Sequence, residues 1–508
     1  MNWELFALIL YFVAMITIGV VFFLRSRSTS DKDYFLGGRS MGPWVTAMSA
    51  QASDMSAWLL MGLPGSVLAF GLGQAWIGIG LAIGTAANWI LVARRLRRFS
   101  AAANDSITLP QYLSNRFATK SPVLQVICAV IFLVCFTVYV ASAFVAGAQV
   151  MKDLFPDINE TLALFIFAAI LIVYTFLGGF KAVCWTDFFQ GILMLAAVLL
   201  VPLLVVLGED LNGELLQNTI ISTTGTEYGF VGNLFRAPPM EIVNGLAWGL
   251  GYFGMPHILV RFMAIKKSSM VKKSAIVAIA WVVLSLGAVV LIAVLARMLV
   301  VDNVPVGELL LAGDKQSMVF VQLSRMLFPA FVAGLLLSAI IAASMSTADS
   351  QLLVASSSFT SDIYKPLLRK KASERETLWV GRGVVIVIAV VAFFIASSKG
   401  KGAQAIMDLV SNAWAGFGSA FGPVVVLSLF WRRFTYKGAV AGVIGGGLVD
   451  VLWLVFESNG IFNTGLYEMV PGVIVGTLAA VIATLLDHKP TPEVTAIYDA
   501  ATSPDGEE

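Results

Sequence analysis

Hydroxyl and carboxyl side chains gather in one apolar stretch in the second half of the sequence. Ser346, Asp349 and Ser350 are spaced i, i+3 and i+4, so they share one face of a helix, with Ser344 and Thr347 beside them. Hard oxygen ligands of this kind suit a small cation such as sodium. The alternative is that the hydroxyls bond neighbouring membrane helices, which would account for a single such residue. For the whole cluster, we interpret the stretch as a cation site.

A single carboxylate stands in an earlier apolar stretch. Asp54 lies between Ser53 and Ser56, and the helix breakers Gly62 and Pro64 follow. An ionised Asp in a membrane helix costs about 2.5–3.5 kcal/mol, so we expect it to face a cation, a polar partner or a water-filled cavity. Alternatively, Asp54 caps the half-helix that restarts beyond it, and the two roles are compatible.

A third stretch combines helix breakers with aromatic rings. Residues 245–254 contain four glycines and Pro256 follows, so a continuous helix is not expected. Trp248, Tyr252 and Pro256 are spaced i, i+4 and i+8 and share a face wherever helix persists. The rings either pack against lipid and other helices or form the walls of a pocket for a small solute. Both interpretations stay open at this point.

The elements that must position these residues are membrane helices. Of the 508 residues, 58% are hydrophobic and only 13% are charged, and the mean hydropathy is +0.86. A soluble domain of this length needs more charge on its surface, whereas repeated runs of about 20 apolar residues match the thickness of a bilayer. The net charge of +2 gives no indication of a nucleic-acid partner. Three cysteines and two histidines show no metal-ligand spacing, and we expect neither an enzyme nor a cofactor.

The hydropathy pattern predicts an all-α polytopic membrane protein with about thirteen transmembrane helices. The expected spans are 4–24, 41–70, 72–93, 121–151, 158–178, 188–208, 239–260, 274–298, 318–352, 377–397, 403–430, 438–456 and 466–486. Most of the 33 Lys and Arg residues fall in one set of alternate loops, among them Arg39, Arg97 and Arg261. This asymmetry predicts a protein of the cytoplasmic (inner) membrane with its N-terminus outside and its C-terminus in the cytoplasm. The acidic tail after His488 is expected to be disordered.

The two interrupted stretches, 41–70 and 239–260, lie five spans apart and run in opposite directions. Such a pair indicates an inverted-repeat transporter with its site near the middle of the membrane. We therefore expect a five-plus-five core with two discontinuous helices. The predicted division is a peripheral first helix and cytoplasmic loop (1–40), a first repeat (41–208), an external loop (209–238), a second repeat (239–430), two peripheral helices (431–487) and a cytoplasmic tail (488–508).

Several short motifs, in order along nearly the whole chain, resemble the solute:sodium symporter family. They are Leu36-Gly-Gly-Arg-Ser40, Ala52-Ser-Asp-Met-Ser56, Met61-Gly-Leu-Pro-Gly65, Trp185-Thr-Asp187, Trp248-Gly-Leu-Gly-Tyr-Phe-Gly254, Pro256-His257, Met345-Ser-Thr347 and Asn412-Ala-Trp-Ala-Gly-Phe-Gly418. The resemblance implies an inverted-repeat core that works by alternating access. It also implies that inward sodium flow drives uptake of a small solute, with sodium as coupling ion and the lipid bilayer as surroundings.

The resemblance also implies roles for individual residues. The implied sodium ligands are the backbone carbonyls of Ala52, Met55 and Ala343 and the hydroxyls of Ser346 and Thr347, with Asp54 tied to sodium and solute binding. The implied solute-binding residues are Ser56, Ala57, Tyr139, Trp248, Tyr252 and Pro256. Arg39 matches a position near the cytoplasmic gate. Asp187 matches an acidic position that helps some members bind a second sodium, and Asp349 and Ser350 are its expected partners; a loop arginine as the partner of Asp349 is the alternative.

Members that carry L-proline provide the nearest match, and proline is the expected solute. The chain departs from them at three places: Ala57 replaces a glycine, Met255 replaces a glutamine, and Asp349 adds a carboxylate. Pantothenate, another amino acid or an osmolyte are the alternative solutes. A proton-coupled carrier, working through Asp54 or Asp349, is the alternative coupling.

Overall fold

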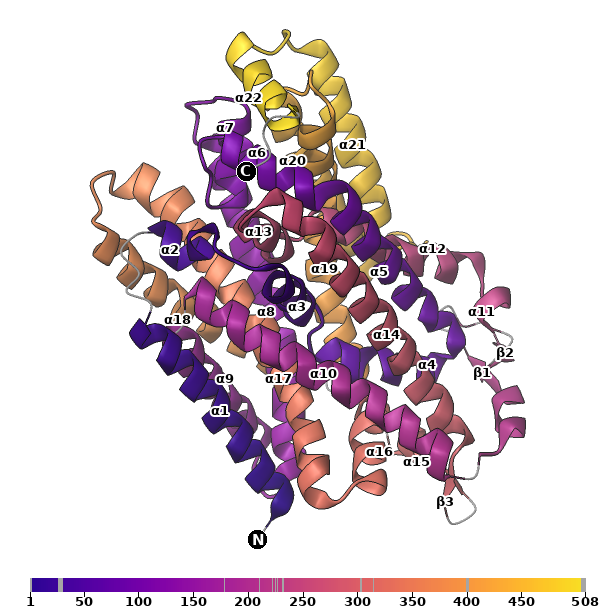
Figure 1. Cartoon of the computed structure of the whole chain (residues 1–508). Helices are drawn as coiled ribbons and strands as arrows, with labels where there is room; N and C mark the ends of the chain where they lie inside the picture. The colour runs from indigo at the N-terminus through magenta and orange to yellow at the C-terminus, as the bar shows by residue number, and fades with distance from the viewer. Residues whose placement is uncertain are drawn as a thin grey trace.

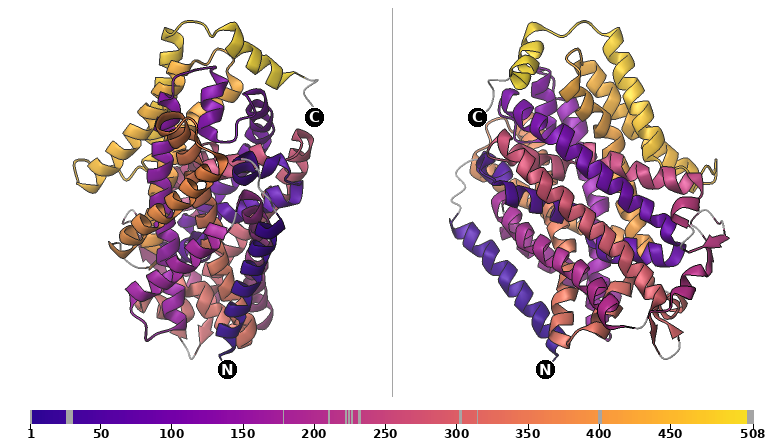
Figure 2. Two further views of the ribbon diagram at one scale, coloured as in Figure 1. Left: turned by 90° about the vertical axis from the view of Figure 1, so that its left-hand side faces the viewer. Right: turned by 45° about the vertical axis from the view of Figure 1, so that its right-hand side comes forward.

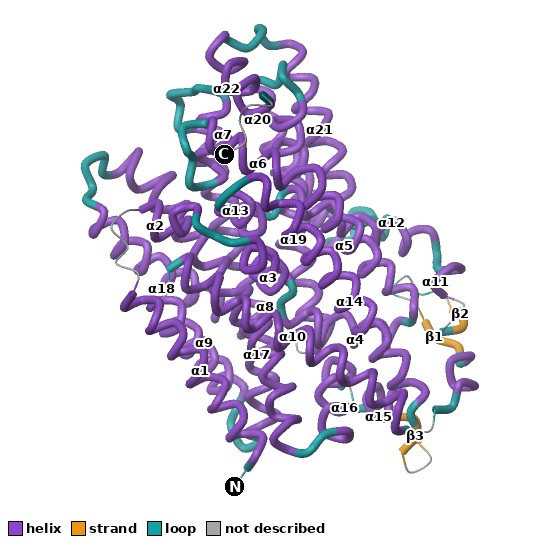
Figure 3. Tube along the Cα trace, viewed as in Figure 1, coloured by secondary structure: helices purple, strands orange, loops and turns teal. Residues whose placement is uncertain are grey.

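The computed structural model describes residues 2–25, 31–177, 179–209, 211–221, 223, 225, 227–230, 233–301, 304–313, 315–398 and 402–503. Helix dominates this part of the chain, and strands occur there only in two small hairpins (Figure 3). The hairpins pair β1 (Thr219–Ile221) with β2 (Glu227–Gly229) and β3 (Val300–Val301) with β4 (Val304–Pro305), both antiparallel.

The helices follow one another with short connections. In chain order they are α1 (Trp3–Arg25), α2 (Asp31–Leu36), α3 (Pro43–Asp54), α4 (Leu63–Phe70), α5 (Ala75–Ala87), α6 (Arg94–Ala102), α7 (Leu109–Arg116), α8 (Val123–Leu154), α9 (Glu160–Leu177), α10 (Phe180–Gly208), α11 (Asn233–Arg236), α12 (Pro239–Ala247), α13 (Pro256–Ala264), α14 (Val271–Met298), α15 (Val306–Ala312), α16 (Val319–Leu327), α17 (Ala330–Ser358), α18 (Glu374–Ser398), α19 (Gly402–Phe430), α20 (Tyr436–Ser458), α21 (Met469–Leu486) and α22 (Pro492–Thr502). Tighter or wider helical segments are η1 (Gly37–Arg39), η2 (Trp58–Gly62), η3 (Leu72–Gln74), η4 (Asn88–Ala93), η5 (Gly213–Gln217), η6 (Trp248–Phe253), η7 (Ser268–Met270), η8 (Gln316–Met318) and η9 (Phe359–Leu368).

Ten helical segments among the described residues are long and apolar enough to cross a membrane. Their burial separates a centre from a periphery. The most apolar windows of Ala330–Leu368 and Gln404–Phe430 are 78% and 83% buried inside the protein, whereas those of Tyr436–Ser458 and Met469–Leu486 are 28% buried. Because a helix that faces lipid leaves its apolar side chains uncovered by protein, α17 and α19 form the centre and α20 and α21 an outer layer. The chain is a multi-pass membrane protein.

Two stretches depart from regular helix where glycine and proline occur. Helix α3 ends at Asp54, and Met55 has φ −83° and ψ 76°, outside the helical region, before η2 begins at Trp58. Helix α12 tightens into η6, and Met255 lies in extended conformation just before α13. Where one span over 318–352 was expected, α16 and α17 are separate elements, and Pro329 lies between them.

The two ends of the helix assembly carry different elements. The N-terminus of α1 lies at the end opposite α6, α7 and α22 in every view (Figures 1 and 2). The expectation of a disordered tail was wrong for residues 492–502, which form α22 against α6. Arg432 donates two hydrogen bonds to the carboxylate of Asp499, and Arg116 donates to the carbonyl of Val494, so α22 is held by basic residues far away in the sequence. Residues 504–508 of the tail lie outside the described part.

Candidate functional site

The end of α3 and the middle of α17 bring the expected sodium ligands together. The Ser346 hydroxyl donates to the carbonyl oxygen of Ala52 at 2.7 Å and lies 3.2 Å from that of Ala343. Thr347 follows in the same helix, and its buried hydroxyl has no hydrogen-bond partner among the described residues. Met55 occupies the non-helical position after α3, where a carbonyl leaves the helical hydrogen-bond pattern. A hydroxyl and two backbone carbonyls therefore converge, as the coordination of a small hard cation requires.

The carboxylate of Asp54 faces an aromatic residue on η6. Its Oδ2 accepts a hydrogen bond from the Tyr252 hydroxyl at 2.5 Å, whereas its buried Oδ1 has no partner among the described residues. The alternative role of Asp54 as a helix cap is not seen, because Oδ2 accepts from Tyr252 and Oδ1 accepts from no described residue. Asp54 thus joins the two interrupted stretches, and its second oxygen remains available for a cation or for a solute.

Trp248, Tyr252 and Tyr139, the three aromatic residues expected of a pocket, are all buried. Sequence reasoning missed two further rings. Trp414 of α19 lies 5.1 Å from Tyr252 edge to face, and it donates to the carbonyl of Trp248 at 2.8 Å. Trp58 lies 6.4 Å from Trp248 between ring centres. Trp414 belongs to one of the family-like motifs, which was the available signal, whereas nothing in the spacing distinguished Trp58.

The remaining expected pocket residues lie on the same two stretches. Ser56 and Ala57 are buried in the gap between α3 and η2, and the Ser56 hydroxyl is 3.5 Å from the backbone N–H of Trp58. Pro256 begins α13, where its missing N–H is not needed. The hydroxyl of Tyr139 on α8 is buried without a hydrogen-bond partner in the described part of the chain. Unpaired buried polar groups are costly, so this hydroxyl is a candidate to bond an ordered water or a ligand.

Glycines let α5 approach the aromatic stretch closely enough to fix it. A Cβ added at Gly84 would lie 2.2 Å from the carbonyl oxygen of Gly249, and one at Gly80 would lie 2.3 Å from that of Gly245. Beyond these contacts, the side-chain amide of Asn88 donates to the carbonyl of Tyr252 at 3.0 Å. The backbone that carries the rings is therefore held directly against α5.

A second polar cluster surrounds a buried ion pair, which sequence reasoning also missed. Arg261 was counted among the loop charges, but it lies on α13 and is 1% exposed. It pairs with Asp187 of α10 at 3.0 Å and donates to the hydroxyls of Ser49 at 2.9 Å and Ser350 at 2.5 Å. The hydropathy average hid this residue because one arginine stands among apolar neighbours. Its guanidinium joins α3, α10, α13 and α17.

Asp349 lies beside this cluster without joining its hydrogen bonds. Neither carboxylate oxygen has a partner among the described residues, nor has Oδ1 of Asp187, and Asp349 is completely buried. The two carboxylates are near enough for their charges to interact. Arg261 thus pairs with Asp187, and no described loop arginine reaches Asp349. When both carboxylates are ionised, the single guanidinium of Arg261 balances only one of them, and one further positive charge would balance the other.

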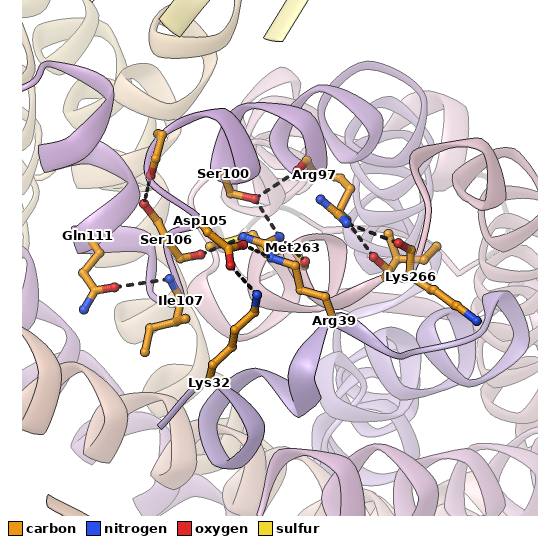
Figure 4. A network of polar contacts seen from close by, with 12 residues as sticks. Lys32, Arg39, Arg97, Ser100, Asp105, Ser106, Ile107, Gln111, Met263 and Lys266 are labelled. Atoms are coloured by element: carbon orange, nitrogen blue, oxygen red, sulfur yellow. Dashed lines mark hydrogen bonds and ion pairs between the residues drawn. The ribbon is translucent and has the colours of Figure 1, made fainter. Parts of the chain in front are cut away.

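At the end that carries α6 and α7, Arg39 joins three segments (Figure 4). Its guanidinium donates to Asp105 at 2.7 Å, to the carbonyls of Ser106 and Met263, and to the Ser100 hydroxyl at 3.1 Å. Lys32 pairs with the same carboxylate from a more exposed position. Arg39 is 7% exposed, so its bonds lie inside the protein rather than on its surface.

The pKa of Asp105 lies below its usual value. Partial burial opposes ionisation, but the hydrogen bond from Lys32 and the charge of Arg39 outweigh it. A lowered pKa means that the pairing is fully present above the usual Asp pKa and is lost only as the pH falls through the lowered value. The network is therefore complete throughout the neutral range.

Known proteins resemble this chain over nearly its whole length. The model of the sodium:solute symporter family matches residues 34–446. The sodium/proline symporter of Haemophilus influenzae is 42% identical, with 97% of this chain and 96% of that protein covered. That of Escherichia coli is 44% identical, with 95% and 92% covered, and the osmoregulated proline transporter OpuE of Bacillus subtilis is 40% identical, with 95% and 94% covered.

Solved structures share the fold. A Na+-coupled sialic acid symporter in a substrate-bound outward-open state matches with a TM-score of 0.72 at 20% identity, covering 96% of this chain and 99% of that one. Mhp1, a nucleobase-cation-symport-1 family transporter, matches with a TM-score of 0.55 at 16% identity, covering 93% and 99%. At these identities the likeness supports the fold alone. With the family match over most of the chain and relatives above 40% identity, this protein belongs to the sodium:solute symporter family.

Proposed function

We propose that the protein is a sodium:proline symporter, which takes up L-proline by secondary active transport driven by the sodium gradient. The observation that carries the proposal is the meeting of two sites at the end of α3. Ala52 accepts the hydrogen bond from Ser346 on the cation side, and Asp54, two residues later, accepts the one from Tyr252 on the aromatic side. The names of the relatives that are 40–44% identical over nearly the full length support proline as the solute.

The proposed order of binding follows from this geometry. Sodium binds first, held by Ser346, Thr347 and the carbonyls of Ala52, Met55 and Ala343, and thereby fixes the end of α3 against α17. The free N–H groups of the next helical segment then receive the solute carboxylate. The rings of Tyr139, Trp248 and Tyr252, with Ser56, Ala57 and Pro256, enclose the pyrrolidine body. Coupling requires that both ligands together favour a state that neither favours alone.

The membrane arrangement that we propose is a thirteen-span protein of the cytoplasmic membrane. Residues 41–208 and 239–430 form inverted repeats, each with a discontinuous first helix, and 209–238 form an external loop. The first helix and 431–487 are peripheral, with the N-terminus outside and 488–508 in the cytoplasm. The positions of the breaks after Asp54 and before Pro256 support this arrangement.

The decisive experiment is uptake into proteoliposomes. The purified protein should accumulate labelled proline when an inward sodium gradient is imposed, and should stop when potassium replaces sodium at fixed pH. Unlabelled pantothenate, other amino acids and osmolytes serve as competitors. Uptake that another solute abolishes at lower concentration than proline would reassign the substrate, and uptake driven by a proton gradient without sodium would reassign the coupling.

The orphan oxygens of Asp349 favour a second cation in addition. With Asp187 and Ser350, Asp349 would hold a second sodium, which raises the sodium:solute ratio; a proton on Asp349 would balance the same charge. Measuring the reversal potential of proline flux at several sodium gradients and pH values separates the two. A dependence on sodium alone with a ratio above one assigns the site to sodium.

Ser346 and Thr347 should control the sodium requirement. Ser346→Ala and Thr347→Ala each remove one proposed ligand, so the sodium concentration for half-maximal uptake should rise about tenfold, the factor that one lost bond to a charged group implies. Ser344→Ala is the matched control, because that buried hydroxyl donates only within its own helix, to the carbonyl of Ile340. Unchanged sodium dependence in both test variants would refute the assigned ion site.

A further inference from the structure

A cavity borders the ring of Trp248. Its volume is about 300 Å3, and Trp248, Tyr467 and Glu468 line it together with Asn244, Asp408 and Glu457. No Lys, Arg or His is among the described residues that line it. Helix α12, which carries Asn244, lies beside the start of α21 (Figure 1). The lining of the cavity therefore combines aromatic rings with carboxylate side chains.

The connection between α20 and α21 is fixed over Trp248 by specific contacts. Asn244 donates to the carbonyl of Gly465 at 2.7 Å and accepts from the N–H of Tyr467 at 2.9 Å. The Tyr467 hydroxyl donates to the carbonyl of Ser411 at 2.7 Å. The ring of Tyr467 stacks on Trp248 with 5.7 Å between centres and 23° between planes. The connection between α20 and α21 therefore forms a fixed wall of the cavity.

Glu468 is the group that this arrangement leaves without a partner. It is 8% exposed, and its buried Oε1 has no hydrogen-bond partner among the described residues, although the residue lines the cavity. The neighbouring acids are engaged: Glu457 accepts from the Thr464 hydroxyl and the N–H of Gly465, and Asp408 accepts from Gln404. A buried carboxylate that lines a cavity together with Glu457 and Asp408 is stabilised by a cation beside it.

We propose that this cavity is an outer binding site for the positively charged nitrogen of a small organic amine, with Glu468 as its charge partner and the rings of Trp248 and Tyr467 as its wall. Aromatic faces together with a carboxylate are the chemistry that recognises ammonium groups. The stacked rings of Trp248 and Tyr467 suit an organic cation rather than a bare alkali ion, which gains little from aromatic faces and prefers several oxygen ligands. The proposal depends on the proposed function in one respect, namely that the transported amino acid is itself a small organic amine.

Glu468→Gln tests the site in the full-length protein. In proteoliposomes at saturating sodium, the variant should need about tenfold more external proline for half-maximal uptake, with an unchanged maximal rate, because one charged contact outside the central site is lost. The matched control is Glu493→Gln, which removes one negative charge from exposed α22 at the opposite end. A shift in sodium requirement without a shift in the proline requirement would overturn the amine assignment.

Choline and its uncharged isostere 3,3-dimethyl-1-butanol test the chemistry without transport. Calorimetric titration of purified wild-type protein should detect choline binding that the neutral alcohol does not reproduce and that Glu468→Gln weakens about tenfold. Equal binding of the two compounds, or equal choline binding by the variant, would overturn the outer site. Absence of sodium-driven proline uptake by the wild type would instead refute the proposed function. The choline titration would then still test the outer site, because it does not depend on transport.

Discussion

Replacing Arg261 with glutamine is expected to lower the free energy of unfolding by about 3–5 kcal/mol and to abolish transport. The guanidinium is 1% exposed and the carboxylate of Asp187 is completely buried, so removal of the arginine leaves an uncompensated charge in a place that water does not reach. The same change removes the donors to Ser49 and Ser350 and loosens the junction of four helices. The midpoint of thermal unfolding in detergent, followed by size-exclusion chromatography of heated samples, measures the effect.

A double-mutant cycle separates the ion pair from simple loss of packing. Asp187→Asn should also destabilise, whereas the Asp187→Asn, Arg261→Gln double variant should be more stable than the sum of the single effects predicts, because neither charge is then left unpaired. Arg432→Gln is the control for an exposed pair: Arg432 and Asp499 are 56% and 54% exposed, and the midpoint should hardly move. Additive effects of the two buried substitutions would contradict a coupled pair.

Residue types and spacing were sufficient to predict the membrane class, and they directed attention to two polar stretches. Oxygen donors on one helical face identified Ser346 and Thr347, and a carboxylate between helix breakers identified Asp54. These signals are local, because a polar group in lipid is costly wherever its partner lies. The structure adds contacts that spacing did not predict: Ser346 reaches the carbonyl of Ala52, and Asp54 accepts from Tyr252.

Partners between distant segments could not be predicted in the same way. Arg261 and Asp187 are 74 residues apart, and the loop charge count assigned Arg261 to the wrong environment. The prediction of a disordered tail was wrong for a related reason. Its acidic composition predicted disorder, but α22 packs against α6, and the buried Arg116 donates to the carbonyl of Val494 across 378 residues. Composition describes what a segment does alone, whereas both outcomes depend on a partner that only the fold supplies.

Replacing Arg39 with glutamine should raise the external proline concentration for half-maximal uptake about ten- to hundredfold. The network around Arg39 ties η1 to α6, to the turn before α7 and to the end of α13. These segments must part if this end, which is the inner end in the proposed topology, is to open. Loss of a buried charge and its bonds costs a few kcal/mol, which lowers the population that binds solute from outside. Apparent affinity falls in proportion to that population.

Lys32→Gln is the matched control, because Lys32 and Arg39 contact the same Asp105 carboxylate. Their side chains are 39% and 6% exposed, so the lysine contact is screened by water and its loss should leave the proline requirement nearly unchanged. The difference between the two variants should also stay constant from pH 6 to pH 8, since the lowered pKa of Asp105 keeps it ionised there. Equal effects of the two substitutions would mean that charge at Asp105, rather than the buried bonds of Arg39, controls the inner end.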